Sequence, residues 1–187
     1  MKKADASRAF SMIDENAWVV DDLQAAMETW LALGFGPFFV ASLDMPEVSY
    51  RGARVPLSLK IAMARAGEVQ IELIQQLNDG PSAYRDVYPA GRGGFHHIRR
   101  QAVNEADGAS DYDALAAEFA SSGIEIVMEM QFGTKRIGYA DARSTLGCMV
   151  EFCDPSESIE SLKRLTADAA LSWDGSDPIR MLDLAEL

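Results

Sequence analysis

The chain has 187 residues, 48% of them hydrophobic, and a formal net charge of −12. This length supports one core, built as one domain or two small fused modules. The charge argues against nucleic acid and anionic membranes as partners. No apolar run approaches the ~20 residues of a membrane span. The start of the chain lacks the apolar core of a secretory signal, so we expect a cytoplasmic protein.

The first half of the chain predicts a βαβββ order of elements. Residues 11–20 favour a strand, and Asp22 then caps a helix in which Leu23, Ala26, Met27 and Trp30 recur at helical spacing. Gly34 and the Gly36-Pro37 pair end that helix. Three strands are expected after it, joined by a long loop over 44–56, at residues 38–42, 57–64 and 69–75.

The same order restarts after residues 78–94, which are rich in Gly, Pro, Ser and Arg. We expect a strand over 96–103, a helix over 111–122 and then three further strands, at residues 125–130, 136–141 and 147–152. A last helix is predicted over 158–171. The domain boundaries we predict are a first module at 9–77, a linker loop at 78–93, a second module at 94–155, and a C-terminal helix and tail at 156–187.

Four polar residues stand among apolar neighbours at matching places in the two modules: Glu15, Glu72, His97 and Glu151. His97 follows Glu15, and Glu151 follows Glu72, by about 80 residues, as a duplicated module would give. Burying three carboxylates together is unfavourable unless a cation intervenes, so we expect a divalent metal ion. The alternative is that these side chains face solvent.

His96 and His97 are neighbours, and successive side chains of a strand point to opposite faces. We therefore assign only His97 to the metal site, and expect His96 to pack beneath the helices or to meet a backbone carbonyl. The ion would polarise a carbonyl while Glu151 or Glu72 takes a proton from the adjacent carbon, the chemistry of isomerases and some lyases. Cys148 and Cys153 are too far apart along one strand for a disulfide, so we expect free thiols.

Several segments together resemble the vicinal oxygen chelate superfamily, which includes glyoxalases, bleomycin-resistance proteins and extradiol dioxygenases. The resemblance spans about residues 10–155. It rests on four segments: Ala17-Trp18-Val19-Val20-Asp21-Asp22-Leu23, Ile71-Glu72-Leu73-Ile74, Gly93-Gly94-Phe95-His96-His97-Ile98, and Leu146-Gly147-Cys148-Met149-Val150-Glu151-Phe152.

The resemblance implies an α+β fold in which two tandem βαβββ modules form a curled, cup-shaped mixed sheet with helices outside. It also implies metal ligands at Glu15, Glu72, His97 and Glu151, with Mg, Mn, Co, Ni or Zn as the ion. Glu15 departs from the His or Gln that is usual at the first position. An extradiol dioxygenase is disfavoured because that chemistry uses two histidines and one carboxylate.

The second and third segments look most like the methylmalonyl-CoA epimerase branch. That similarity implies a metal-dependent isomerase or lyase that stabilises an enolate next to a carbonyl of a small substrate, such as a thioester. Glu47 would be a second acid or base beside Glu72 and Glu151, and Arg99 and Gln70 would bind substrate. We expect a homodimer. If Glu15 prevents metal binding, a metal-free enzyme or a sequestering protein of the bleomycin-resistance type is the alternative.

Overall fold

The computed structural model describes residues 13–103 and 109–183. The predictions for residues 9–12, in the expected first module, and 184–187, in the tail, lie outside the described residues. The elements of the first half are β1 Ile13–Val19, α1 Leu23–Ala32, β2 Phe38–Tyr50, β3 Ala53–Ala66, β4 Val69–Gln76 and α2 Ala83–Val87. Those of the second half are β5 Gly94–Gln101, α3 Tyr112–Ser121, β6 Ile126–Phe132, β7 Lys135–Ala140, α4 Arg143–Leu146, β8 Met149–Cys153, α5 Glu157–Ser172 and β9 Ile179–Met181.

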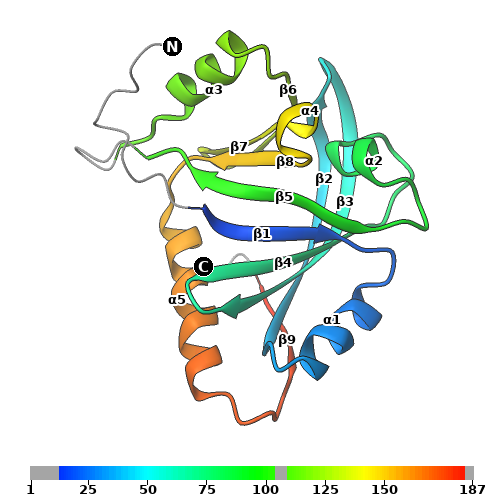
Figure 1. The fold of residues 1–187 in the computed structure, drawn as a ribbon, viewed down its shortest axis with the longest axis vertical. Coiled ribbons are helices and arrows are strands. Elements are labelled where there is room, and N and C mark those ends of the chain that lie inside the picture. The colour runs from blue at the N-terminus through cyan, green and yellow to red at the C-terminus, as the bar shows by residue number, and fades with distance from the viewer. Residues whose placement is uncertain (1–12, 104–108, 184–187) are drawn as a thin grey trace.

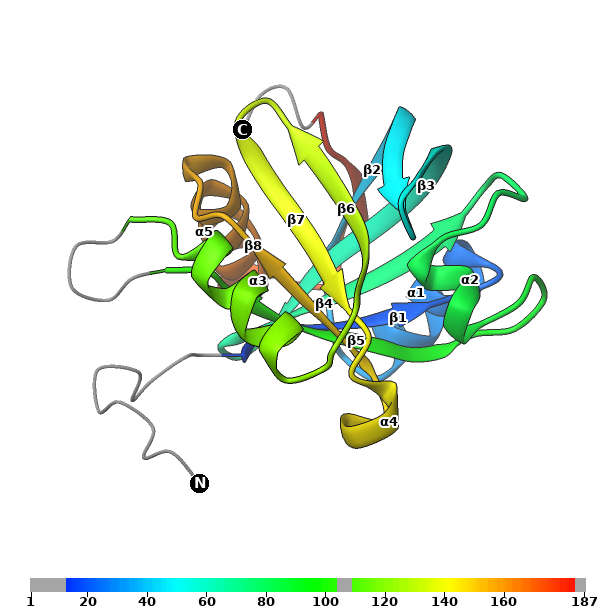
Figure 2. The same ribbon diagram turned by 90° about the horizontal axis from the view of Figure 1, so that it is seen from above.

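The described strands form one sheet in the order β3-β4-β1-β5-β8-β7-β6-β2-β9, and β2 also pairs with β3. That extra pairing curls the sheet into a barrel-like cup, seen from above in Figure 2. Each half repeats the same arrangement, because β4 lies parallel to β1 and β8 lies parallel to β5. The antiparallel pair of β1 and β5 joins the halves. The predicted α+β fold of two βαβββ units is therefore confirmed.

Alternating side chains give the sheet an inner and an outer apolar face. On the outer face, Leu23 and Met27 of α1 pack on the first half, while Tyr112 and Leu115 of α3 pack on the second. The inner face carries the largest buried cluster, to which Ile159 and Leu162 of α5 also belong. In Figure 1, α5 runs along the side of the cup where β1 begins and β5 ends.

The prediction of a loop over 44–56 is wrong. Strands β2 and β3 continue through this segment as a long hairpin and turn at Arg51 and Gly52. Pro46 and Pro56 lie within these strands, where the pairing of β2 with β3 skips a register between Met45 and Val48. A β-bulge of this kind tolerates proline within a strand.

The expected linker is also more than a loop, because it contains α2, capped by the side chain of Ser82. The expected last helix is present as α5. Both cysteines are free, as predicted, and both are buried. Within residues 13–103 and 109–183, none of the helices is long and apolar enough to cross a membrane.

Candidate metal site and cavity

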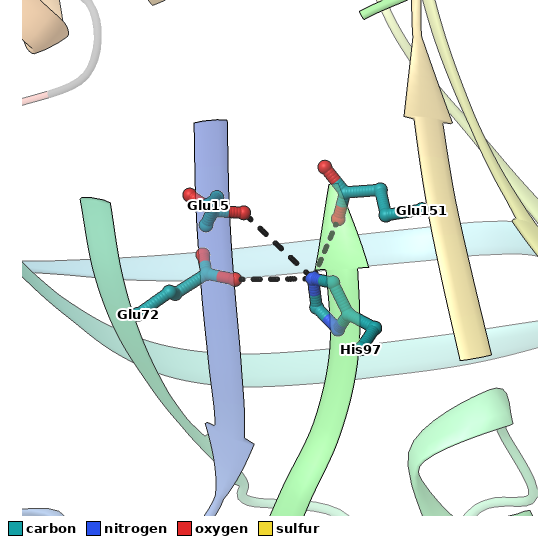
Figure 3. A group of neighbouring side chains, drawn as sticks. All are labelled: Glu15, Glu72, His97 and Glu151. Carbon is teal, nitrogen blue, oxygen red and sulfur yellow. Dashed lines mark ion pairs between the residues drawn. The ribbon is translucent and has the colours of Figure 1, made fainter. Parts of the chain in front are cut away.

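One side chain from each of four adjacent strands points to a common centre inside the cup (Figure 3). Glu15 comes from β1, Glu72 from β4, His97 from β5 and Glu151 from β8, and one donor atom of each lies within 4.8 Å of the others. The Nε2 atom of His97 is 3.3 Å from Glu151, 3.7 Å from Glu15 and 3.8 Å from Glu72. The structure thus brings together all four residues singled out from the sequence.

His97 is oriented by His96, which occupies a β-bulge. The pairing of β1 with β5 skips a register beside His96, so both imidazoles lie on the inner side. Nε2 of His96 lies 3.0 Å from the carbonyl oxygen of Ala83, which can only accept a hydrogen bond. Nδ1 of His96 then accepts from Nδ1 of His97, 2.9 Å away. This leaves Nε2 of His97 as the atom that faces the carboxylates. The backbone carbonyl contact expected for His96 is present, but the expectation that His96 points to the opposite face is wrong, because the bulge turns both imidazoles inward.

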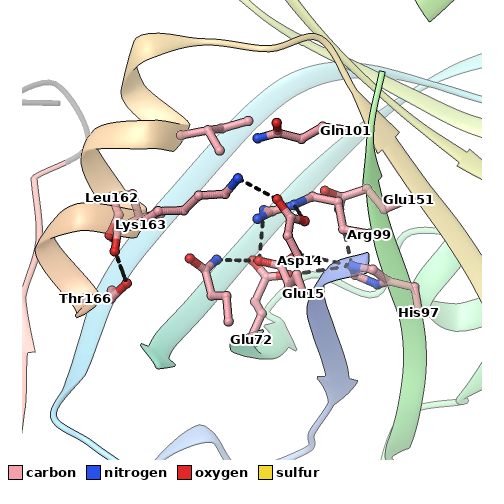
Figure 4. A network of polar contacts seen from close by, with 12 residues as sticks. Asp14, Glu15, Glu72, His97, Arg99, Gln101, Glu151, Leu162, Lys163 and Thr166 are labelled. Atoms are coloured by element: carbon pink, nitrogen blue, oxygen red, sulfur yellow. Dashed lines mark hydrogen bonds and ion pairs between the residues drawn. The ribbon is translucent and has the colours of Figure 1, made fainter. Parts of the chain in front are cut away.

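Glu15 is held by a buried polar network (Figure 4). Its Oε2 atom accepts hydrogen bonds from the Gln70 amide and from Nη1 of Arg99. Arg99 also bonds Asp14 at 2.9 Å, and Asp14 in turn pairs with Lys163 of α5 at 2.6 Å. The C-terminal helix is therefore linked to the metal cluster through three ion pairs.

The two remaining carboxylates, Glu151 and Glu72, differ in the hydrogen bonds that they receive. The hydroxyl of Tyr139, opposite Glu151 in the pairing of β7 with β8, donates to Glu151 at 2.5 Å. Tyr84 lies 2.9 Å from Tyr139, oxygen to oxygen. Glu72 lies opposite Met63, whose thioether cannot donate a hydrogen bond. Among the described residues, Glu72 receives no hydrogen bond.

The pKa values reflect this crowding. Burial and the charges of Glu15 and Glu151 hold the pKa of Glu72 well above its usual range. Burial alone would raise the pKa of Glu151, but the close contact with His97 and its positive charge lower it to about 2. Burial alone would lower the pKa of His97, but Glu15 and Glu151 raise it to about 9. Without a metal, a proton on His97 thus supplies the positive charge at the centre of the cluster.

The donor set fits a divalent cation. Nε2 of His97 is buried and makes no hydrogen bond to any described residue. Donor atoms bound at about 2.0–2.2 Å around one ion lie about 3–4 Å apart, which agrees with the distances from His97 to the carboxylates. Three carboxylates with one imidazole form a hard donor set that suits Mg, Mn or Co-like ions.

A mainly apolar cavity of about 260 Å³ opens onto this cluster. Glu72, Glu151, Tyr84, Tyr139, Gln70 and Arg99 supply its polar end. Its apolar lining comes from both halves and from α5: Leu43, Leu59, Ile61, Met63, Met130, Phe132, Ile137, Ile159 and Leu162. Such a cavity suits a small, largely apolar molecule with one polar end at the cluster.

The other residues proposed from the sequence lie in two different places. Arg99 and Gln70 line the cavity, and their Nη2 and Oε1 atoms respectively have no hydrogen-bond partner in the described part of the chain. Both therefore border the cavity while they hold Glu15. Glu47 is exposed on the β2–β3 hairpin, pairs with Arg54 at 3.1 Å and is not part of the cavity lining.

Sequence reasoning missed Tyr139, Tyr84 and Lys163. Tyr139 could have been found from the repeat, because it lies opposite Glu151 as Met63 lies opposite Glu72. Tyr84 lies in the segment expected to be a linker. Lys163 lies on a helix outside the repeat, so its contact with Asp14 had no sequence signal.

Comparisons with known proteins agree with this architecture. A profile of the Glyoxalase/Bleomycin resistance protein/Dioxygenase superfamily matches residues 15–140. The hypothetical protein BH1468 from Bacillus halodurans C-125 is similar at a TM-score of 0.52 and 18% identity, over 79% of this chain and 96% of that one. Methylmalonyl-CoA epimerase from Mycobacterium tuberculosis is similar at 0.50 and 17%, over 79% and 90%.

A search of curated proteins found no match. The two solved structures share the fold at low identity. The superfamily profile covers most of the two repeated halves, including Glu15, Glu72 and His97. The chain belongs to the glyoxalase, bleomycin-resistance and dioxygenase superfamily.

Proposed function

We propose that this protein is a metal-dependent isomerase or lyase that moves a proton next to a carbonyl group of a small substrate, such as a thioester. The observation that carries the proposal is the cluster of three carboxylates and one imidazole at the polar end of an apolar cavity. Glu15, Glu72, His97 and Glu151 would hold the ion, which when bound polarises the carbonyl and makes the adjacent carbon more acidic.

Glu72 is our candidate for the residue that takes the proton. It lines the cavity and, among the described residues, accepts no hydrogen bond, so its oxygens are available to substrate. Glu151 also lines the cavity, but Tyr139 fixes one of its oxygens. We therefore assign Glu151 to holding the ion alone, and Glu72 to proton transfer in addition to its place among the ion's ligands. Glu47 has no part in this proposal because it is exposed and paired with Arg54.

Arg99 and Gln70 position Glu15 and line the cavity, and among the described residues one polar atom of each has no hydrogen-bond partner. We propose that these atoms bind a polar group of the substrate near the carbonyl. One similar structure is named a methylmalonyl-CoA epimerase, which supports this class of reaction, although at 17% identity it does not identify the substrate. We also propose a homodimer, which sedimentation at micromolar concentration would test.

Metal binding is tested first. We expect about one equivalent of divalent metal per chain by elemental mass spectrometry of gently purified protein, or after titration with Mn²⁺. His97→Ala should lose it, because the imidazole faces all three carboxylates. Glu47→Ala is the control, since Glu47 lies outside the cavity. Wild-type protein that refuses Mg, Mn, Co, Ni and Zn would contradict the proposal.

Proton transfer is tested by solvent exchange. NMR in D₂O would follow loss of the α-proton signal of branched acyl-CoA thioesters, including methylmalonyl-CoA, with Mn²⁺ present. We expect Glu72→Gln to reduce exchange by at least 100-fold at saturating Mn²⁺. Glu47→Gln makes the same chemical change on the exposed hairpin and should leave exchange unaltered. Equal exchange in wild type and Glu72→Gln would remove Glu72 from this role.

A metal-free binding protein is the second candidate. It is favoured by one observation, that Arg99 and Gln70 already satisfy one oxygen of Glu15 without an ion. Under this alternative, apolar ligands would bind equally well to protein treated with EDTA and to protein supplied with Mn²⁺. No metal uptake and no proton exchange would accompany that binding.

A further inference from the structure

A row of inward-facing side chains on β7 leads away from the metal cluster. Tyr139, Ile137 and Lys135 alternate with outward-facing residues, and all three line the cavity. At ~3.3 Å per residue, the backbone at Lys135 lies about 13 Å along the strand from Tyr139. The row therefore runs from a hydroxyl at the cluster, through an apolar middle, to an ammonium group.

The first half of the repeat has an apolar residue at the place of Lys135. Glu151 pairs with Tyr139 as Glu72 pairs with Met63. Lys135 lies four residues before Tyr139, and Leu59 lies four residues before Met63, so the two occupy equivalent positions in the repeat. Leu59 lines the same cavity. The second half therefore has a charged side chain at the position where the first half has a leucine.

Lys135 has no partner for its charge among the residues that the structure describes. It is half-buried, and among residues 13–103 and 109–183 its ammonium group makes no hydrogen bond or ion pair. Burial raises the pKa of the Cys153 thiol on β8, and the positive charge of Lys135 partly opposes this rise. The ammonium group of Lys135 is therefore available to pair with an anion bound in the cavity.

We propose that Lys135 binds an anionic group, a carboxylate or a phosphate, at the end of the substrate opposite to its reacting carbonyl. This rests on the proposed function and narrows the substrate to a class: an apolar chain with a carbonyl at the metal cluster and a negative charge beyond it. Ser158, in the first turn of α5, lines the same cavity and offers a hydroxyl to that group.

The test uses the full chain treated with EDTA, so that its outcome does not depend on metal binding. Isothermal titration calorimetry would measure octanoate, octyl phosphate and octan-1-ol, which share one apolar chain and differ in the end group. We expect at least one anion to bind about 10-fold or more tightly than the alcohol. Its preference over the other anion identifies the carboxylate or the phosphate as the group recognised.

Two variants then test whether Lys135 causes the tighter binding of the anion. Lys135→Met should remove the advantage of the anion and leave the affinity for octan-1-ol unchanged. Lys60→Met is the matched control, because Lys60 lies on β3 beside Leu59 but is not part of the cavity lining. Anions that bind no better than the alcohol to wild type, or equally well to Lys135→Met, would overturn the inference. A failure of the proposed function would instead appear as absent metal uptake and proton exchange.

Discussion

The two repeated halves bring a glutamate to the same place and give it different surroundings. Glu151 in the second half accepts a hydrogen bond from Tyr139, whereas Glu72 in the first half lies opposite Met63 and receives none in the described structure. Strand alternation and pairing fix where each carboxylate lies, and the residue on the neighbouring strand decides what it can do. The repeat thus supplies equivalent positions that single substitutions have made chemically distinct.

We expect the largest change in stability at a position where one half has a buried charge and the other does not. Arg99, two residues after His97, bonds Asp14 and Glu15, while Ala17 takes the equivalent place after Glu15. Arg99→Met should lower the free energy of unfolding in urea by about 3–5 kcal/mol, because two buried carboxylates lose their partner. Arg54→Met, in an exposed ion pair, should change it by less than about 0.5 kcal/mol. A small loss of stability in Arg99→Met would mean that Lys163 and Gln70 are enough to stabilise Asp14 and Glu15.

Packing beneath α3 gives the next prediction. Gly138 lies opposite Phe152, and at the equivalent pair in the first half Ala62 lies opposite Leu73. A methyl group at position 138 would overlap the Phe152 ring and lie 2.6 Å from the Tyr112 hydroxyl. Gly138→Ala should therefore cost about 1–3 kcal/mol in thermal unfolding.

The double variant Gly138→Ala with Phe152→Leu recreates the pair found in the first half. It should be less destabilised than the sum of the two single changes, since the leucine leaves room for the added methyl group. Strict additivity would show that the glycine serves another purpose.

A pH-dependent difference is expected at Asp154, where the first half has the uncharged Gln75. Arg136 bonds Asp154 at 2.9 Å, and Ser110 also donates to it. Burial would raise the pKa of Asp154, but these bonds outweigh it and lower the pKa below the ordinary 3.8. The ionised carboxylate therefore adds stability above about pH 4, which is lost as the pH falls through the folded-state pKa.

Asp154→Asn should be less stable than wild type by about 1 kcal/mol at pH 7. The gap should close as the pH falls below 3.8 in urea titrations. A gap that stays constant with pH would locate the effect in packing and not in charge.

The smallest effect distinguishes the two helix starts. Asp22 accepts a hydrogen bond from the backbone N–H of Ala25 at 3.0 Å, whereas the Asp111 side chain makes no cap hydrogen bond. Asp22→Ala should cost about 1 kcal/mol, and Asp111→Ala only a few tenths, measured by urea unfolding. Equal losses would show that the cap bond at α1 contributes little.

The sequence predicted the fold and the four clustered residues because both depend on local periodicity and on the repeat. Alternation along each strand assigns Glu15, Glu72, His97 and Glu151 to inner positions, and the near-equal spacing pairs them across the two halves. It failed over 44–56, where β2 and β3 continue as one long hairpin with a bulge in β2 that accommodates proline.

Only the tertiary structure decided which residues support the cluster. The bulge at His96, the donation from Tyr139 and the link from Lys163 through Asp14 to Arg99 each join segments that are distant in the chain or out of register. The sequence determined which side chains face inward, because that follows from the backbone of a single strand. Their hydrogen bonds follow from how strands and α5 pack, which no local pattern encodes.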